Sequence, residues 1–218
     1  MNASNKGSIK NLVLVPALIT LAVTLLRLTG ELLNWSPVLF NKAAGGGGAL
    51  IGIAWLVPIF GFYFARQLLK ANDYPGGTGR VFGFSFLALA VFVVLAGIGF
   101  QMPTGSVWVF LMVVIAAAAG LFIARKAWPS LFSTLFAYGL AARIPVVLVM
   151  LIAIMGNWGT HYDVSPPNFP EMTPFAKWAA IGLFPQLTFW VAFTVIIGSI
   201  FGGIALAVTK RSPAKAVS

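Results

Sequence analysis

Charged side chains inside long apolar runs are the first candidates for chemistry in this sequence. Arg143 lies in YGLAARIPVV, and Arg27 and Glu31 lie four residues apart in LLRLTGE. A charged residue inside a membrane span costs about 2.5 kcal/mol or more unless it is paired or hydrated, and such residues commonly mark ion or substrate paths. A guanidinium in a hydrated interior would bind an anion. We therefore interpret Arg143, Arg27 and Glu31 as candidate residues of a ligand or ion path.

Each of these residues also has a purely structural interpretation. If the helix continues through LLRLTGE, Arg27 and Glu31 share a face and could form an ion pair at the membrane interface. Arg143 could bind backbone carbonyls freed by a proline kink, or a lipid phosphate. The polar groups that are candidates to line an interior site with Arg143 are Gln186, Tyr138 and Thr188.

A second polar group lies in GNWGTHYDVSPPNFPEMTP, residues 156–174, which holds the only histidine of the chain, His161, with Asp163 and Glu171. These three could ligate a metal ion, but their spacing matches no recognised signature, and we assign no metal site. No second histidine or G-x-S-x-G turn accompanies the serines, so we assign no catalytic residue. Four prolines in residues 166–174 and several aromatic residues predict an extended, rigid cap on the outer face, which carries His161, Asp163 and Glu171.

The composition indicates which class of protein positions these residues. Of the 218 residues, 60% are hydrophobic and 8% are charged, whereas a soluble domain carries about 25% charged residues. The absence of cysteine excludes disulfides and thiolate metal sites. The net charge of +10 does not indicate a nucleic-acid partner, because the cations lie in short clusters at the ends of apolar runs. The sequence predicts an integral membrane protein that spans the bilayer several times.

The apolar runs predict an all-α bundle of about six transmembrane helices. The predicted spans are residues 11–30, 49–66, 81–100, 107–124, 130–155 and 181–208. Most are close to the ~20 residues that cross a ~30 Å hydrocarbon core. We therefore predict one transmembrane domain, residues 11–208, between an N-terminal tail, residues 1–10, and a basic C-terminal tail, residues 209–218.

The distribution of cations predicts the orientation of the bundle. With the N-terminus inside, only Lys42 and Lys177 fall in outer loops. Because loops rich in Lys and Arg stay in the cytoplasm, we expect both termini to be cytoplasmic, the cap to be extracytoplasmic, and the location to be a bacterial cytoplasmic membrane. The ten inner cations are Lys6, Lys10, Arg66, Lys70, Arg80, Arg125, Lys126, Lys210, Arg211 and Lys215.

Small residues and prolines predict how the spans pack. In IIGSIFGGIA, Gly198 and Gly202 form a G-x-x-x-G motif, with Gly203 beside it. Such motifs bring helices into close contact, either within one chain or between two copies of it. Pro58 and Pro145 lie inside predicted spans and should kink them.

The other predicted outer loop contains a run of four glycines in NKAAGGGGALIG. Glycines before a helix can expose backbone amides to an anion. No phosphate-binding motif surrounds this run, so we interpret it as a flexible entry to the second span.

Three function classes are compatible with these features. We favour a small transporter or channel-like protein for an ion or small solute, with an anion suggested by Arg143. The alternative is a non-catalytic accessory or assembly subunit of a larger membrane complex, and the third is a membrane enzyme acting on a lipid. The expected partners are the lipid bilayer and either other membrane subunits or a second copy of the chain. No cofactor is indicated, and contact with a quinone or pigment stays open.

Overall fold

The structure is a computed structural model that describes residues 3–210, and within that range it is helical, without strands. Five helical stretches are long and apolar enough to cross a membrane: Ile9–Leu32, Thr78–Phe100, Val107–Arg125, Pro129–Gly156 and Pro174–Thr209. The prediction of a helical membrane bundle is confirmed. The elements are α1 (Ala3–Leu32), η1 (Ala44–Gly46), α2 (Leu56–Lys70), α3 (Thr78–Phe100), α4 (Val107–Arg125), α5 (Pro129–Gly156), α6 (Pro174–Lys177), η2 (Trp178–Leu183), α7 (Phe184–Leu187) and α8 (Phe189–Lys210).

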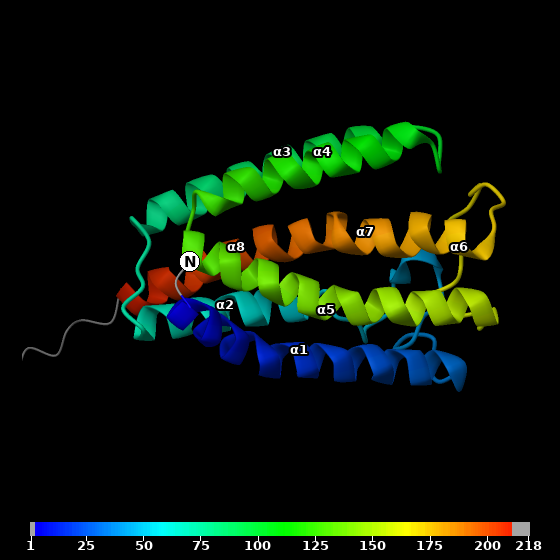
Figure 1. The fold of residues 1–218 in the computed structure, drawn as a ribbon, viewed down its shortest axis with the longest axis horizontal. Helices are drawn as coiled ribbons and strands as arrows, with labels where there is room; N and C mark the ends of the chain where they lie inside the picture. The colour runs from blue at the N-terminus through cyan, green and yellow to red at the C-terminus, as the bar shows by residue number, and fades with distance from the viewer. Residues whose placement is uncertain (1–2, 211–218) are drawn as a thin grey trace, which may run out of the picture.

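The helices run alongside one another, and their loops gather at two ends (Figure 1). Helices α3 and α4 lie together on one side, α8 runs through the middle, and α1 lies on the opposite side beside α5. The end that holds residues 33–55, 101–106 and 157–173 is here called the cap end. The opposite end, called the basic end, holds the start of α1 and the end of α8. The cations at the basic end whose side chains the structure describes are Lys10, Arg66, Lys70, Arg80, Arg125 and Lys126.

The second predicted span, residues 49–66, is wrong in its boundaries. Helix α2 begins at Leu56 and its 15 residues extend only about 22 Å. Residues 47–55, at the cap end, contain no helix. Pro58 is the third residue of α2, where a missing N–H breaks no helical hydrogen bond. This proline therefore belongs to the start of the helix, and the kink predicted at Pro58 is wrong. Pro145, in contrast, lies inside the continuous helix α5.

The last membrane helix begins before the predicted residue 181. Thr173 caps its N-terminus by accepting from the Ala176 N–H at 3.4 Å, and Pro174 takes the first helical position. The helical path then continues to Lys210 through a π-helical stretch, Trp178–Leu183. Pro185 follows this stretch and lacks the N–H that an α-helix would use, which favours the irregular turn before it.

Glycines of α8 hold the basic half of the bundle together. A side chain at Gly61 of α2 would lie 2.5 Å from the Gly198 carbonyl oxygen, and one at Gly202 would collide with Leu131 of α5. A side chain at Gly203 would lie 2.9 Å from the Phe82 ring of α3. The three glycines thus contact three neighbouring helices of the same chain. This packing leaves no face of these glycines free for a contact between two copies of the chain.

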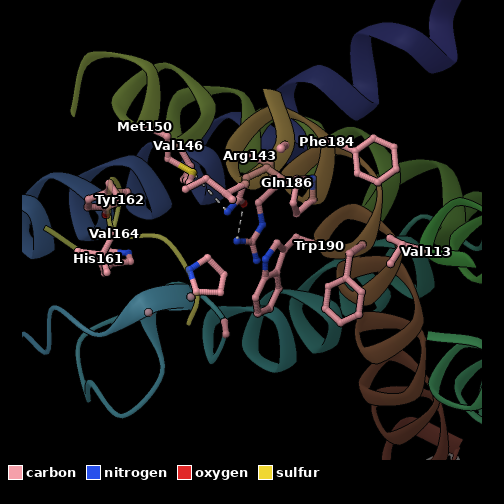
Figure 2. Close-up of a pocket in the computed structure, with 18 of the residues that line it drawn as sticks. Val113, Arg143, Val146, Met150, His161, Tyr162, Val164, Phe184, Gln186 and Trp190 are labelled. Atoms are coloured by element: carbon pink, nitrogen blue, oxygen red, sulfur yellow. Dashed lines mark hydrogen bonds between the residues drawn. The ribbon is translucent and has the colours of Figure 1, made fainter. Parts of the chain in front are cut away.

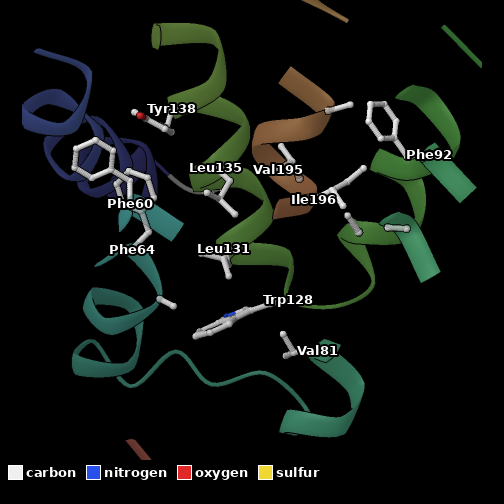
Figure 3. Close-up of a cluster of buried hydrophobic side chains, with 14 of the residues drawn as sticks. Phe60, Phe64, Val81, Phe92, Trp128, Leu131, Leu135, Tyr138, Val195 and Ile196 are labelled. Carbon is white, nitrogen blue, oxygen red and sulfur yellow. The ribbon is translucent and has the colours of Figure 1, made fainter. Parts of the chain in front are cut away.

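An aromatic layer fills the interior of the same half (Figure 3). The Tyr138 ring lies edge-on to Phe60 and Phe64, with ring centroids 5.3 and 5.4 Å apart. The Tyr138 hydroxyl is 2.8 Å from that of Thr20 on α1. All three aromatic residues are buried, with at most 7% of each exposed.

Candidate functional site

The cap half of the bundle encloses a cavity of about 730 Å³. Its walls come from α1, residues 45–55, the α3–α4 turn, α5, the segment 157–173, and the irregular part of the last helix around Pro185. Among its lining residues, Thr104 and the 38% exposed Val164 are exposed at the cap end. Arg143 is its deepest lining residue on α5, and the aromatic layer with Tyr138 lies beyond it toward the basic end.

Arg143 points into this cavity and is only 4% exposed (Figure 2). Its Nη1 donates to Gln186 Oε1 at 3.2 Å, and its Cζ lies 4.7 Å from the centre of the Trp190 ring. Its Nε is buried without a hydrogen-bond partner. No carboxylate among the described residues lies within 4.0 Å of it. The guanidinium is therefore only partly satisfied by the protein.

The position of Arg143 makes this lack of partners costly. It lies in the middle of the 28-residue helix α5, with about 20 Å of helix on either side. A cation–π contact contributes about 0.5–2 kcal/mol, while an uncompensated buried charge costs about 3–5 kcal/mol. The expected alternative of backbone carbonyls is not realised, because Gln186 is its sole hydrogen-bond partner among the described residues. An anion in the cavity would complete the site.

Gln186 reaches Arg143 from the irregular part of the last helix. It follows Pro185, and its amide nitrogen also lies 3.8 Å from the Met150 sulfur. The indole of Trp178 donates to the Val147 carbonyl at 3.0 Å, which ties the π-helical stretch to α5. π-helical turns are frequent at functional sites because they shift side chains out of helical register.

Arg27 and Glu31 form a buried cluster with His161 at the cap end of the cavity. Arg27 Nε donates to Glu31 Oε1 at 2.8 Å, as their four-residue spacing allows. The other carboxylate oxygen accepts from the His161 backbone N–H at 2.8 Å, and the ring Nδ1 contacts Oε1. Glu31 is completely buried and Arg27 is 7% exposed, so the predicted ion pair forms inside the protein.

The segment 157–173 is buried at one turn, at residues 160, 162 and 163, and is half-buried or exposed elsewhere. Asp163 accepts from the backbone N–H groups of Gly159 and Thr160 at 2.9 and 2.7 Å, which fixes the turn that carries His161. Tyr162 donates to the Thr24 carbonyl at 3.2 Å. The prolines do not form one extended strap, because a turn closes between residues 166 and 169 at 3.2 Å.

The three polar residues predicted for the cap have separate surroundings. Asp163 is used within its own turn, Glu171 is exposed, and His161 pairs with Glu31 on α1. The described residues contain no group of three or more side chains placed to hold a metal ion. The geometry thus makes His161 part of the same site as Arg27.

The glycine run, residues 45–48, packs against the cluster of Arg27, Glu31 and His161. It does not lead directly into α2, which begins only at Leu56. Arg27 Nη2 donates to the carbonyls of Asn41 and Gly46 at 3.0 and 3.1 Å. A side chain at Gly46 would lie 2.9 Å from His161 Cδ2 and 3.3 Å from Arg27 Nη1, and its φ is +72°. Only glycine fits this position without strain. The run of glycines marked this segment in the sequence. The sequence did not show that Gly46 packs against His161 and Arg27.

Arg143 gives the cavity wall one positive charge without a carboxylate partner among the described residues, whereas Glu31 balances the charge of Arg27. Arg27 and Arg143 line the cavity, whereas among the described residues no carboxylate does. Burial lowers the pKa of His161, and the charge of Arg27 acts in the same direction, while the hydrogen bond to Glu31 opposes both. Because an ionised carboxylate only accepts hydrogen bonds, the ring Nδ1 of His161 is the donor in its contact with an ionised Glu31.

Sequence reasoning placed some of the site correctly and missed other parts. Gln186 lines the cavity as expected, but Tyr138 belongs to the aromatic layer. The hydroxyl of Thr188 donates to its own helix, to the Phe184 carbonyl at 2.7 Å. Trp190 was not predicted, since nothing in an apolar helix marks which aromatic ring lies under a cation.

No protein-family model matches this chain, and the comparisons with curated proteins and with solved structures give no match either.

Proposed function

We propose that this protein is a membrane carrier for a small anion, which binds at Arg143. The observation that supports the proposal is the buried guanidinium of Arg143, which lines the cavity with its Nε unpartnered and has no carboxylate partner among the described residues. Natural proteins rarely keep a charge at membrane depth without a function. The cavity is larger than a structural brace would need.

A carrier fits this cavity better than an open channel does. The cavity leads from exposed residues at the cap end to Arg143, and the layer of Tyr138, Phe60 and Phe64 fills the interior beyond it. An anion would reach the middle of the bundle from one side only, and its release on the other side would need a conformational change. With the basic end in the cytoplasm, the anion enters from outside.

Ligand-induced stabilisation tests the binding step. Purified full-length protein is heated with acetate, benzoate or inorganic phosphate, and a ligand at 100 times its Kd should stabilise it by about 2.7 kcal/mol. We expect at least one anion to raise the Tm of the wild type and of the control R66L, which changes an arginine bound to Thr209 at the basic end. R143L should not respond. An unchanged response in R143L would refute the proposed site.

Uptake into proteoliposomes tests the transport step with the same anion and the same two variants. Uptake by the wild type and R66L, and none by R143L, is the expected result.

Native mass spectrometry of the protein from its own host tests the alternative that the chain is an accessory subunit. A stoichiometric complex with larger membrane proteins, without uptake by the isolated chain, would replace the carrier by an accessory subunit.

A further inference from the structure

We infer that the anion is amphipathic, with one acidic group held at Arg143 and an apolar body held against the α3–α4 side of the cavity. This inference rests on the proposed function, because it assumes that Arg143 binds an anion. It adds the chemical class of the ligand, which the charge of Arg143 alone does not define.

The polar groups of the cavity are concentrated on one wall. Arg27 comes from α1, Arg143 from α5 and His161 from the turn that packs on α1. Tyr162 joins this wall through its hydrogen bond to the Thr24 carbonyl. In Figure 2, Tyr162 and His161 lie at one side of the cavity, and Arg143 lies with Gln186 and Trp190 near its centre.

The opposite wall has almost no polar side chains. The α3–α4 hairpin contributes one hydroxyl, that of Thr104, which is exposed at the rim. Figure 2 shows Val113 and Phe184 on the side away from His161. The rings of Phe110 and Phe184 pack edge-on, with centroids 5.0 Å apart, so this wall is continuous between α4 and α7. Its other apolar members are Phe100, Val109 and Phe189.

This two-sided lining does not suit a small hydrophilic anion. Cavities of ~300–1,000 Å³ generally enclose a drug-sized ligand, and the present one has about 730 Å³. Acetate or phosphate at Arg143 would leave the apolar wall facing water. A hydrocarbon chain on the same acid would displace that water, and each buried methylene should strengthen binding about fourfold. An acid with an apolar chain would place its charged group at Arg143 and its chain against the apolar wall.

Such a ligand could come from water, as a free alkyl or aryl acid, or from the bilayer, as an anionic lipid. Both present the same chemistry, an acidic group joined to a hydrocarbon chain. The exposed residues Thr104 and Val164 give the cavity contact with the cap end, and α4, which forms part of the apolar wall, also has exposed apolar residues on its outer face.

A chain-length series tests the inference with the full-length protein in nanodiscs of neutral lipid. The probes are acetate, butanoate and octanoate, with octanol as the uncharged control. We expect affinity to rise steeply from acetate to octanoate, octanol to bind weakly, and R143L to lose all three acids. V113N, which places an amide on the apolar wall, should keep acetate binding and lose most of the gain for octanoate. The matched control V114N changes the neighbouring residue, which faces away from the bundle and is 40% exposed.

The outcomes separate this inference from the proposed function. If no acid binds in an Arg143-dependent way, the proposed function fails. If acetate and octanoate bind equally well and both need Arg143, the proposed function stands and the amphipathic ligand is refuted. Should V113N fail to fold, as loss of acetate binding would reveal, the chain-length series of the wild type still decides. Phosphatidic acid added to the nanodiscs should compete with octanoate if the ligand comes from the bilayer, and should have no effect if it comes from water.

Discussion

Two arginines in the cap half of the bundle show how differently one residue type can be used. Arg27 donates to a carboxylate and to two backbone carbonyls, and so it holds α1 and the glycine run together. Arg143 has one amide and one aromatic ring as partners, and its Nε has none. At the scale of the residue, the first side chain is held by three partners within the protein, whereas the second leaves its buried Nε without a partner among the described residues.

The stability of the empty protein should therefore improve when Arg143 is removed. R143L exchanges a partly satisfied buried charge for an apolar side chain, which in comparable buried sites is neutral or stabilising by about 1–4 kcal/mol. We expect the unfolding free energy of R143L without ligand to equal or exceed that of the wild type in denaturant titrations. A loss of several kcal/mol would mean that Arg143 is an internal brace, and would contradict a ligand site.

At the scale of the element, the segments that depart from regular helix form the site. The cavity is lined by the glycine run, the turn at residues 159–163 and the stretch around Pro185. Non-helical backbone at membrane depth is tolerated where it is covered by protein or lines a cavity. Here Arg27 and Asp163 satisfy backbone groups that no helix satisfies. The site thus depends on these irregular segments being held firmly.

Two neighbouring glycines allow the fit of the glycine run to be measured. Gly45 and Gly46 both have a φ of +72°, but a side chain at Gly45 meets nothing within 4 Å, whereas one at Gly46 meets His161 and Arg27. G45A should cost about 1–2 kcal/mol for the left-handed backbone alone. G46A should cost a further ~1–3 kcal/mol from overpacking and should weaken anion binding. Equal effects of G45A and G46A on stability and binding would show that the contact with His161 does not matter.

At the scale of the whole molecule, most of the described cations lie on segments at the basic end of the bundle, whereas the loops that line the cavity lie at the cap end (Figure 1). The rule that basic loops stay in the cytoplasm then predicts that the cap end lies outside. The direction in which the proposed anion enters follows from this orientation.

The orientation can be measured easily because the chain has no cysteine. Single cysteines replace exposed residues at the two ends, in E171C at the cap end and Y74C at the basic end. A membrane-impermeant maleimide should label E171C in intact cells and Y74C only after the membrane is disrupted. The reverse pattern would overturn the predicted orientation.

The sequence predicted the helical bundle well because composition and hydropathy are summed over local windows of about 20 residues. Four of the six predicted spans, residues 11–30, 81–100, 107–124 and 130–155, lie within the observed helices. The second span failed because hydropathy does not report backbone conformation, and residues 49–55 are apolar without being helical. The sixth was extended by a cap at Thr173 that lies outside the apolar run.

The sequence by itself determined that the chain is apolar and helical enough for a membrane, where its cations lie, and that Arg143 occurs in mid-span. The local spacing of Arg27 and Glu31 was also sufficient for their ion pair. Only the tertiary structure decided that Glu31 pairs with His161, 130 residues away, and that Gly46 lies against both His161 and Arg27. Such contacts depend on the packing of several helices at once, and no local pattern of residues specifies that packing.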